Sequence, residues 1–319
     1  MAAKRASPGF HVLGVIRYGE KARIDTNVGF PAFSLSMQSL DRSDIFEVWA
    51  SPDPVVYGEF DRIRFAANEH ILFGGMHLQE QEHETLELAP YRAYRSALEL
   101  LRDQDYPYPL RMWNYFPGIN EEFLGLERYQ RFCLGRYQAF AEHGYTFDGD
   151  LPAASAIGIQ GEGLWVYFLA AREPGLQIEN PRQISAYRYP LRYGPRSPSF
   201  SRATLADFAG ERQLYLSGTA SIVGHETRHR NNAAAQIRET LANIEAILDH
   251  PAVNARLGVN HLDGSSGLKV YIRDPADFEL VSDMLAEAVG AECPILYLQG
   301  DVCRRDLMLE IEGVIRLPR

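Results

Sequence analysis

The stretch LWVYFL at residues 164–169 and the stretch LMLEIE at residues 307–312 are two short apolar segments, each typical of a buried β-strand. They lie 143 positions apart (164 to 307). A second pair has the same offset (71 to 214): ILFGG at 71–75 and LYLSG at 214–218 are strands that end in glycine. Two pairs with one offset indicate that the chain contains the same unit twice.

The segments between these strands follow a common order in the two halves. Each half continues with an amphipathic helix, a strand stopped by proline and a second helix, expected at 91–102, 110–116 and 127–142 in the first half and at 233–248, 268–274 and 277–289 in the second. We therefore predict an α+β fold of two tandem β-α-β-α-β domains with mixed sheets packed by helices. The expected domains are 1–171 and 197–319, joined by an Arg- and Tyr-rich connector at 172–196. Two unrelated α/β domains remain the alternative, whereas a duplicated pair favours a site between the copies.

The composition excludes several classes of function. With 46% hydrophobic residues the 319-residue chain can bury two cores, and its net charge of −10 argues against general binding of nucleic acid or of an anionic membrane. Three widely spaced cysteines predict neither a disulfide framework nor a Cys-rich zinc site. The longest apolar run, 164–171, cannot span a bilayer, and residues 1–19 contain no signal-peptide pattern. We expect a cytoplasmic protein without nucleic-acid or membrane partners.

The strongest local charge lies in the connector and just after it. Between Asn180 and Ala206 the chain carries no acidic residue but five arginines with three tyrosines among them: Arg182, Tyr187, Arg188, Tyr189, Arg192, Tyr193, Arg196 and Arg202. A solvated basic loop would explain this pattern, and so would RNA contact through stacked aromatic residues. Arginine forks and tyrosine hydroxyls also suit carboxylate or phosphate groups. A small anionic ligand held between the domains agrees better with the acidic remainder of the chain.

Two glutamates alternate with apolar residues in the last strand. The pattern LEIE at 309–312 places both glutamates on one face, with Leu309 and Ile311 on the other. A solvated strand face would explain this alternation. The matching position in the first copy is Tyr167, however, which predicts a face that is at least partly buried. A carboxyl group there, such as that of Glu310, has a raised pKa and can act as a general acid or base.

Cys303 precedes Glu310 by seven residues and is followed by two arginines. A lone cysteine is most often a small core residue. Arg304 and Arg305 would favour its thiolate form if their side chains point toward the sulfur. Cys303 is therefore a candidate site residue only because it lies near Glu310 and the two arginines in the sequence.

The sequence HETRH at 225–229 matches H-E-x-x-H, the helical signature of zinc hydrolases. Zinc binding requires His225 and His229 on one face of a helix. The motif instead follows a strand and a run of small residues, and amphipathic periodicity begins only after Asn232. We expect a loop without zinc here, and a zinc hydrolase remains an alternative function.

The second half resembles a known family of small domains. From about residue 197 to 317 it is similar to the YjgF/RidA family, through LSG at 216–218, the helical segment at 236–244 and the terminal strand at 306–312. This resemblance implies YjgF/RidA-like (chorismate mutase-like) domains, which commonly form trimers.

Nearly the whole chain resembles the chorismatases, in which a YjgF-type domain is fused to a divergent second one. The segments that match are 113–115, 132–136 with Tyr129, 185–190 with 193–195, 217–225 and 303–312. The resemblance makes the H-E-x-x-H sequence the tail of a family loop. It also implies a substrate, chorismate, whose enolpyruvyl ether is split to release pyruvate without a metal or an organic cofactor.

The same resemblance assigns roles to individual residues. It implies that Glu310 transfers the proton that makes the enol ether cleavable. Chorismate is a dianion, and the resemblance places Arg136 and Arg188, with Tyr129 and Tyr187, at its two carboxylates.

The resemblance also bears on the products. A cysteine at position 303 marks the branch of the family that forms 3-hydroxybenzoate, whose sum with pyruvate equals chorismate with no net water. Ala220 would contact the ring or the enolpyruvyl side and affect water access, but typical members of that branch have glycine there, so 4-hydroxybenzoate stays open as a product. Hydrolysis to 3,4-dihydroxycyclohexa-1,5-diene carboxylate and a non-catalytic YjgF-like binding protein are further alternatives. We expect a protein of secondary metabolism, either a monomer or a homo-oligomer such as a trimer.

Overall fold

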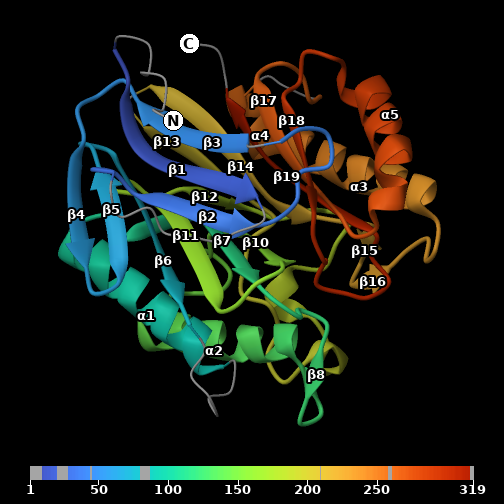
Figure 1. Cartoon of the computed structure of the whole chain (residues 1–319), viewed down its shortest axis with the longest axis horizontal. Helices are drawn as coiled ribbons and strands as arrows, with labels where there is room; N and C mark the ends of the chain where they lie inside the picture. The colour runs from blue at the N-terminus through green and yellow to red at the C-terminus, as the bar shows by residue number, and fades with distance from the viewer. Residues whose placement is uncertain are drawn as a thin grey trace.

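Two six-stranded sheets with the same strand order form the framework of the protein (Figure 1). The computed structural model describes residues 9–19, 28–43, 45–79, 87–208, 210–257 and 261–316. The first sheet has the order β10-β7-β11-β6-β5-β4, formed by Ala153–Gly158, Tyr108–Phe116, Leu164–Ala171, Ile71–Leu78, Ile63–Ala67 and Val56–Phe60. The second has the order β18-β17-β19-β14-β13-β12, formed by Ile295–Gln299, Ser266–Ile272, Leu309–Arg316, Glu211–Thr219, Ala203–Phe208 and Leu176–Ile178.

Corresponding strands also run in corresponding directions. β10 pairs with β7, and β18 with β17, in parallel, whereas the other pairings within the two sheets are antiparallel. The α+β fold predicted from the repeated strands is confirmed, with one unit present twice. The predicted number of three strands per unit was wrong, because each sheet has six. Among the strands missed, β10 consists mostly of small residues and β12 has only three residues, too few for a periodic signal.

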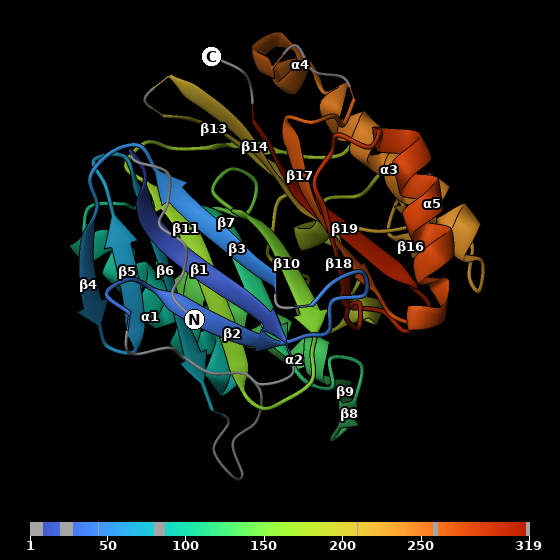
Figure 2. The same cartoon turned by 45° about the horizontal axis from the view of Figure 1, so that its top comes forward.

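Helices cover one face of each sheet. α1 (Leu88–Asp103) and α2 (Arg128–Glu142) pack on the first sheet, and α3 (Ala233–Leu248) and α5 (Phe278–Val289) pack on the second (Figure 2). A short helix, α4 (Pro251–Leu257), follows α3. Among the helices of the described residues, none is both long and apolar enough to cross a membrane.

Local sequence explains where a helix begins and how closely two of them pack. The side chain of Asn232 caps α3 by accepting a hydrogen bond from a backbone N–H of its first turn. Gly135 in α2 faces the carbonyl oxygen of Glu87, just before α1, and a Cβ atom there would overlap with that oxygen. The resulting close contact of the two helices fixes α2, which carries Tyr129 and Arg136.

A third sheet covers much of the remaining face of the first. It has the order β2-β1-β3, and Phe33 and Trp49 pack with Phe73 and Trp113 in one apolar cluster. Its strands are β1 (His11–Gly19), β2 (Ala32–Ser36) and β3 (Ile45–Ser51). The smaller elements are the hairpins β8 (Glu122–Phe123) with β9 (Leu126–Glu127) and β15 (Ile222–Val223) with β16 (Glu226–Thr227), and the 3-10 turns η1 (Ala186–Arg188), η2 (Leu191–Tyr193) and η3 (Pro275–Asp277).

The two large sheets meet through the faces that carry no helix. Tyr115 of β7 packs with Tyr271 of β17 in the same cluster, and their hydroxyl oxygens lie 2.8 Å apart. A backbone bridge joins Gly158 to Asp301. The predicted connector contributes β12 to the second sheet, so the chain passes directly from one copy to the other. Side chains of both copies are thereby brought into a shared interior.

Candidate active site

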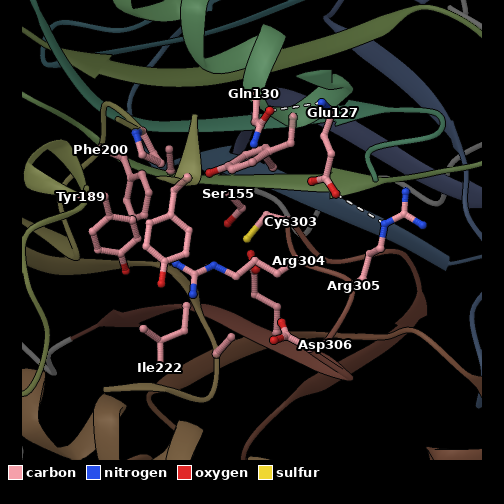
Figure 3. A pocket seen from close by; sticks show the side chains of 18 of the residues that line it. Glu127, Gln130, Ser155, Tyr189, Phe200, Ile222, Cys303, Arg304, Arg305 and Asp306 are labelled. Carbon is pink, nitrogen blue, oxygen red and sulfur yellow. Dashed lines mark hydrogen bonds and ion pairs between the residues drawn. The ribbon is translucent and has the colours of Figure 1, made fainter. Parts of the chain in front are cut away.

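A cavity of about 400 Å³ lies between the two sheets, lined by residues of both copies and of the connector (Figure 3). Tyr129, Arg136, Ala220, Cys303 and Glu310 all line it. They come from α2, from the loop after β14, from the loop before β19 and from β19 itself. The fold therefore brings five residues put forward from the sequence to one place.

Glu310 is a buried carboxyl group on the inner face of β19. Its side chain points away from the core that contains Leu309 and Ile311, and the residue is 4% exposed. A bulge in β14 places Gly218 against it, where a Cβ atom would overlap with the carboxylate. Burial, followed by the charge of Glu312, raises the pKa of Glu310 to about 8. The predicted buried face and raised pKa are confirmed, and Glu310 is mostly protonated at neutral pH.

Glu312, two residues along the same face, is in the opposite state. Its carboxylate lies 2.7 Å from the Arg111 guanidinium and 2.8 Å from the Lys269 ammonium. It also accepts hydrogen bonds from the Trp113 indole and from the Ser155 hydroxyl. Burial alone would raise its pKa, but the two cations and the hydrogen bond from Ser155 hold the pKa of Glu312 below its ordinary value. The site therefore combines one neutral and one ionised glutamate.

Cys303 faces the cavity as a neutral thiol. Burial and the neighbouring Glu310 raise its pKa to about 12, against a smaller lowering by Arg304. The condition stated for a thiolate is not met, because Arg304 lies over the rings of Tyr189 and Tyr193 instead of pointing toward the sulfur. In Figure 3 the side chains of Cys303 and Ser155 both point into the pocket.

Two buried arginines bring positive charge to the cavity. Arg136 and Arg202 are 3% and 4% exposed. Within the described residues neither has a carboxylate at ion-pair distance, and the charge of Arg202 interacts only at longer range with Glu179. Arg136 donates to the carbonyl oxygen of Ser199, and Arg202 donates to the Tyr189 hydroxyl at 2.8 Å. The Nε atom of each guanidinium is buried without a partner in the part of the chain that is described. Because an uncompensated buried charge is costly, these two cations favour an anionic ligand.

The connector contributes to the cavity through other residues than those expected. Tyr187 and Arg188 do not line it, and the exposed Arg188 lies over the Tyr187 ring. Tyr189, Arg192 and Tyr193 line it instead, the first directly after the 3-10 turn η1 and the other two within η2. The composition of this segment was visible from the sequence, but it has no periodicity from which to choose among its arginines and tyrosines.

The H-E-x-x-H sequence is no helix. His225 lies in the turn of the β15–β16 hairpin, where its Nδ1 atom is 2.9 Å from an Arg192 nitrogen. His229 has a positive φ of 56° and contacts Glu239. A left-handed residue cannot continue an α-helix, so the two imidazoles do not share a helical face, and the zinc hydrolase alternative was wrong. Across the described ranges, no group of three or more His, Cys, Asp or Glu residues is arranged to hold a metal ion.

Comparison with known proteins gives one consistent result. The family model described as chorismatase FkbO/Hyg5-like, N-terminal, matches residues 47–170. A 3-hydroxybenzoate synthase from Streptomyces hygroscopicus is 38% identical over 317 residues, covering 96% of this chain and 92% of that protein. A chorismatase from Streptomyces rapamycinicus is 35% identical over 312 residues, covering 95% and 92%. A crystal structure of a chorismatase matches with a TM-score of 0.87 at 35% identity, covering 95% of this chain and 92% of the other.

Proposed function

The chain belongs to the chorismatase family, and on this premise we propose that it cleaves chorismate to pyruvate and 3-hydroxybenzoate, with Glu310 as the proton donor. One observation carries the proposal: a neutral, buried carboxyl group and two buried arginines that form no ion pair within the described residues line the same cavity. The first group can protonate an enol ether, and the others can bind a dianion. The name of the Streptomyces hygroscopicus relative supports 3-hydroxybenzoate as the aromatic product.

Substrate binding follows from the charges that line the cavity. Arg136 and Arg202 supply two guanidinium groups for two carboxylates, and Arg304 adds a third at the side of Tyr189. Tyr129 remains a neutral hydroxyl donor, because burial raises its pKa well above the ordinary value. Binding restores charge balance to a site that is positively charged without substrate.

Glu310 can serve as both acid and base in one cycle. Its carboxyl proton passes to the terminal methylene carbon of the enolpyruvyl group, which leaves an oxocarbenium ion at the ether carbon. The neighbouring ring hydroxyl oxygen bonds to this carbon, and its proton moves to the ether oxygen. When the ring carbon that bears the ether loses its proton to the Glu310 carboxylate, the ring carbon–oxygen bond of the former hydroxyl and the bond between the ether oxygen and the pyruvyl carbon both break. The ring thus becomes aromatic and keeps the ether oxygen as its hydroxyl group, and the former hydroxyl oxygen becomes the keto oxygen of pyruvate. The atoms of 3-hydroxybenzoate and pyruvate then equal those of chorismate, and the enzyme ends in its starting state.

Product analysis tests the proposal directly. Purified protein is incubated with chorismate, pyruvate is measured with a coupled dehydrogenase, and the ring acids are separated by chromatography. We expect pyruvate and 3-hydroxybenzoate in equal amounts. Pyruvate with the dihydroxycyclohexadiene carboxylate or with 4-hydroxybenzoate would overturn the product assignment. The absence of pyruvate would overturn the proposed activity and favour the alternative of a non-catalytic binding protein.

The activity depends on pH through Glu310. Because the reaction needs the protonated acid, kcat/KM is expected to be constant below about pH 7 and to fall tenfold per unit above about pH 8, the pKa of Glu310 in the free enzyme. Bound chorismate, a dianion, disfavours the further negative charge of an ionised Glu310, so the fall in kcat should occur at higher pH than the fall in kcat/KM. Initial rates at limiting and saturating chorismate across pH 5.5 to 10 measure the fall of kcat/KM and the fall of kcat. A kcat/KM that still rises above pH 8 would contradict this role of Glu310.

Gly218 is expected to be essential for the position of Glu310. In Gly218→Ala the new methyl group overlaps with the carboxylate and displaces it, which we expect to lower kcat/KM by about 100-fold. Gly267→Ala is the matched control, since a Cβ atom at Gly267 in β17 meets no atom within 4 Å. Equal rates for the two variants would show that Gly218 has no such role.

Cys303 is expected to control which oxygen reaches the oxocarbenium ion. Cys303→Ala leaves space beside the Ser155 hydroxyl that a water molecule can occupy, so 3-hydroxybenzoate should give way to the hydrolytic product as the main ring acid. The product ratio is read by chromatography. Cys293→Ala, in the core under α5, is the control and should keep the wild-type ratio. An unchanged ratio in Cys303→Ala would remove the thiol from product control.

A further inference from the structure

A buried cluster of four charged side chains joins all three sheets beside the cavity. Arg111 comes from β7, Lys269 and Glu312 from β17 and β19, and Glu47 from β3. Glu312 pairs with Arg111 and Lys269, and Lys269 pairs with Glu47 at 3.1 Å. The side chains are 1% exposed for Arg111 and Glu312, 10% for Lys269 and 19% for Glu47. Such burial makes the balance of charge within the cluster important.

The cluster is neutral without Glu310. Two carboxylates, Glu47 and Glu312, balance two cations, Arg111 and Lys269. An ionised Glu310 would be a third carboxylate with no cation of its own in the cluster. The balance therefore favours the neutral form of Glu310 before any substrate is bound.

Glu312 itself cannot replace Glu310 as the acid. Both of its oxygens are occupied: Oε1 accepts from Trp113 and contacts Lys269, and Oε2 accepts from Arg111 and Ser155. It does not line the cavity, whereas Ser155 does. Glu312 is thus held as a fixed anion behind the cavity wall, about 7 Å along the strand from Glu310.

The groups that face Glu310 from the surrounding elements are few. Glu312 lies on its own strand, and Tyr271 is its neighbour in β17. The other charged or titratable groups that interact with it are Arg111 of β7, Arg202 after the connector, Cys303 of the preceding loop and Tyr129 of α2. Arg111 is already paired with Glu312, and Arg202 lowers the pKa of Glu310 less than burial and Glu312 raise it. Glu312 is the one carboxylate in this set.

We propose that Glu312 is a positioning residue that keeps Glu310 in its acid form between turnovers, through a negative charge held in place by Arg111, Lys269 and Ser155. The inference rests on the proposed function of Glu310 as a general acid. It predicts opposite effects from changes at two ends of one ion pair. Removal of the Glu312 charge should make Glu310 more acidic, and removal of the Lys269 charge should make it less acidic.

The test measures the pKa of Glu310 in two ways. The first is the alkaline limb of kcat/KM in wild type, Glu312→Gln and Lys269→Met. The second is a ¹³C NMR titration of glutamate side-chain carbons in the free proteins, with Glu310→Gln used to assign the resonance. The titration does not depend on turnover, so it separates a failure of this inference from a failure of the proposed activity.

We expect Glu310 to titrate about one pH unit lower in Glu312→Gln and at higher pH than wild type in Lys269→Met, with matching changes in the alkaline limb. If Glu312→Gln does not fold by circular dichroism, the double variant Glu312→Gln/Lys269→Met keeps Arg111 balanced by Glu47 and should again titrate lower. Folded variants that titrate as wild type, or that both move in the same direction, would overturn the proposal.

Discussion

Glu310→Gln is expected to reduce the release of pyruvate from chorismate by about 10³-fold or more. The amide has nearly the same shape as the protonated carboxyl group but cannot give a proton to carbon, and general acid catalysis contributes roughly 10²- to 10⁴-fold. Since Glu310 is neutral at neutral pH, the exchange should leave substrate affinity nearly unchanged. Single-turnover rates and calorimetric titration with chorismate measure the two quantities separately.

The stability of the same variant gives an independent check. Glu310 keeps its proton up to about pH 8 in the folded protein, whereas its ordinary pKa is 4.5. The unfolded chain therefore loses this proton first, and wild type loses stability as pH rises from 4.5 to 8, by about 3 kcal/mol at pH 7. Glu310→Gln avoids this loss, so its Tm should exceed that of wild type at pH 8 and approach it near pH 4.5. Normal activity in this variant would contradict the role of Glu310 as proton donor, and easier unfolding than wild type at pH 8 would contradict its raised pKa.

The repeated strands carried most of the information about the fold. LWVYFL and LMLEIE have strong apolar patterns at a fixed offset. The first lies in β11 and the second overlaps the start of β19, in two sheets with one topology. The strand AASAIG, β10, has no such pattern, yet it supplies Ser155 to the cavity wall. β10 forms because it pairs with β7 and contacts the other copy, and neither contact can be predicted from the local sequence of the strand.

The candidate site was predictable where a residue's own strand fixes its direction. Alternation placed Glu310 and Glu312 on the inner face of the strand, where both side chains are buried. Their different protonation states were not predictable, because Arg111 lies 201 positions from Glu312 in the sequence and meets it only across the two sheets. Arg304 is next to Cys303 in sequence but points elsewhere, so adjacency alone could not decide whether the thiol ionises.

Arg136→Met is expected to weaken substrate binding strongly. The buried guanidinium has no anionic partner in the described part of the chain and faces the cavity, so it is available to a carboxylate of chorismate. Loss of charge-assisted hydrogen bonds worth roughly 1.5–3 kcal/mol each should raise KM by about 100-fold, with a smaller change in kcat. Steady-state rates at saturating and limiting chorismate separate the two constants.

The stability of Arg136→Met separates a binding arginine from a structural one. Because the free protein already bears the cost of burying this unpaired charge, an apolar side chain among the rings of Tyr94 and Phe132 should leave Tm unchanged or raise it. Arg131→Met on the same helix is the matched control, since Arg131 is also buried but pairs with Glu87 at 2.6 Å and does not line the cavity. It should lower Tm and keep the wild-type KM. If Arg136→Met instead lowers Tm and leaves KM unchanged, Arg136 supports the fold and another cation binds the carboxylate.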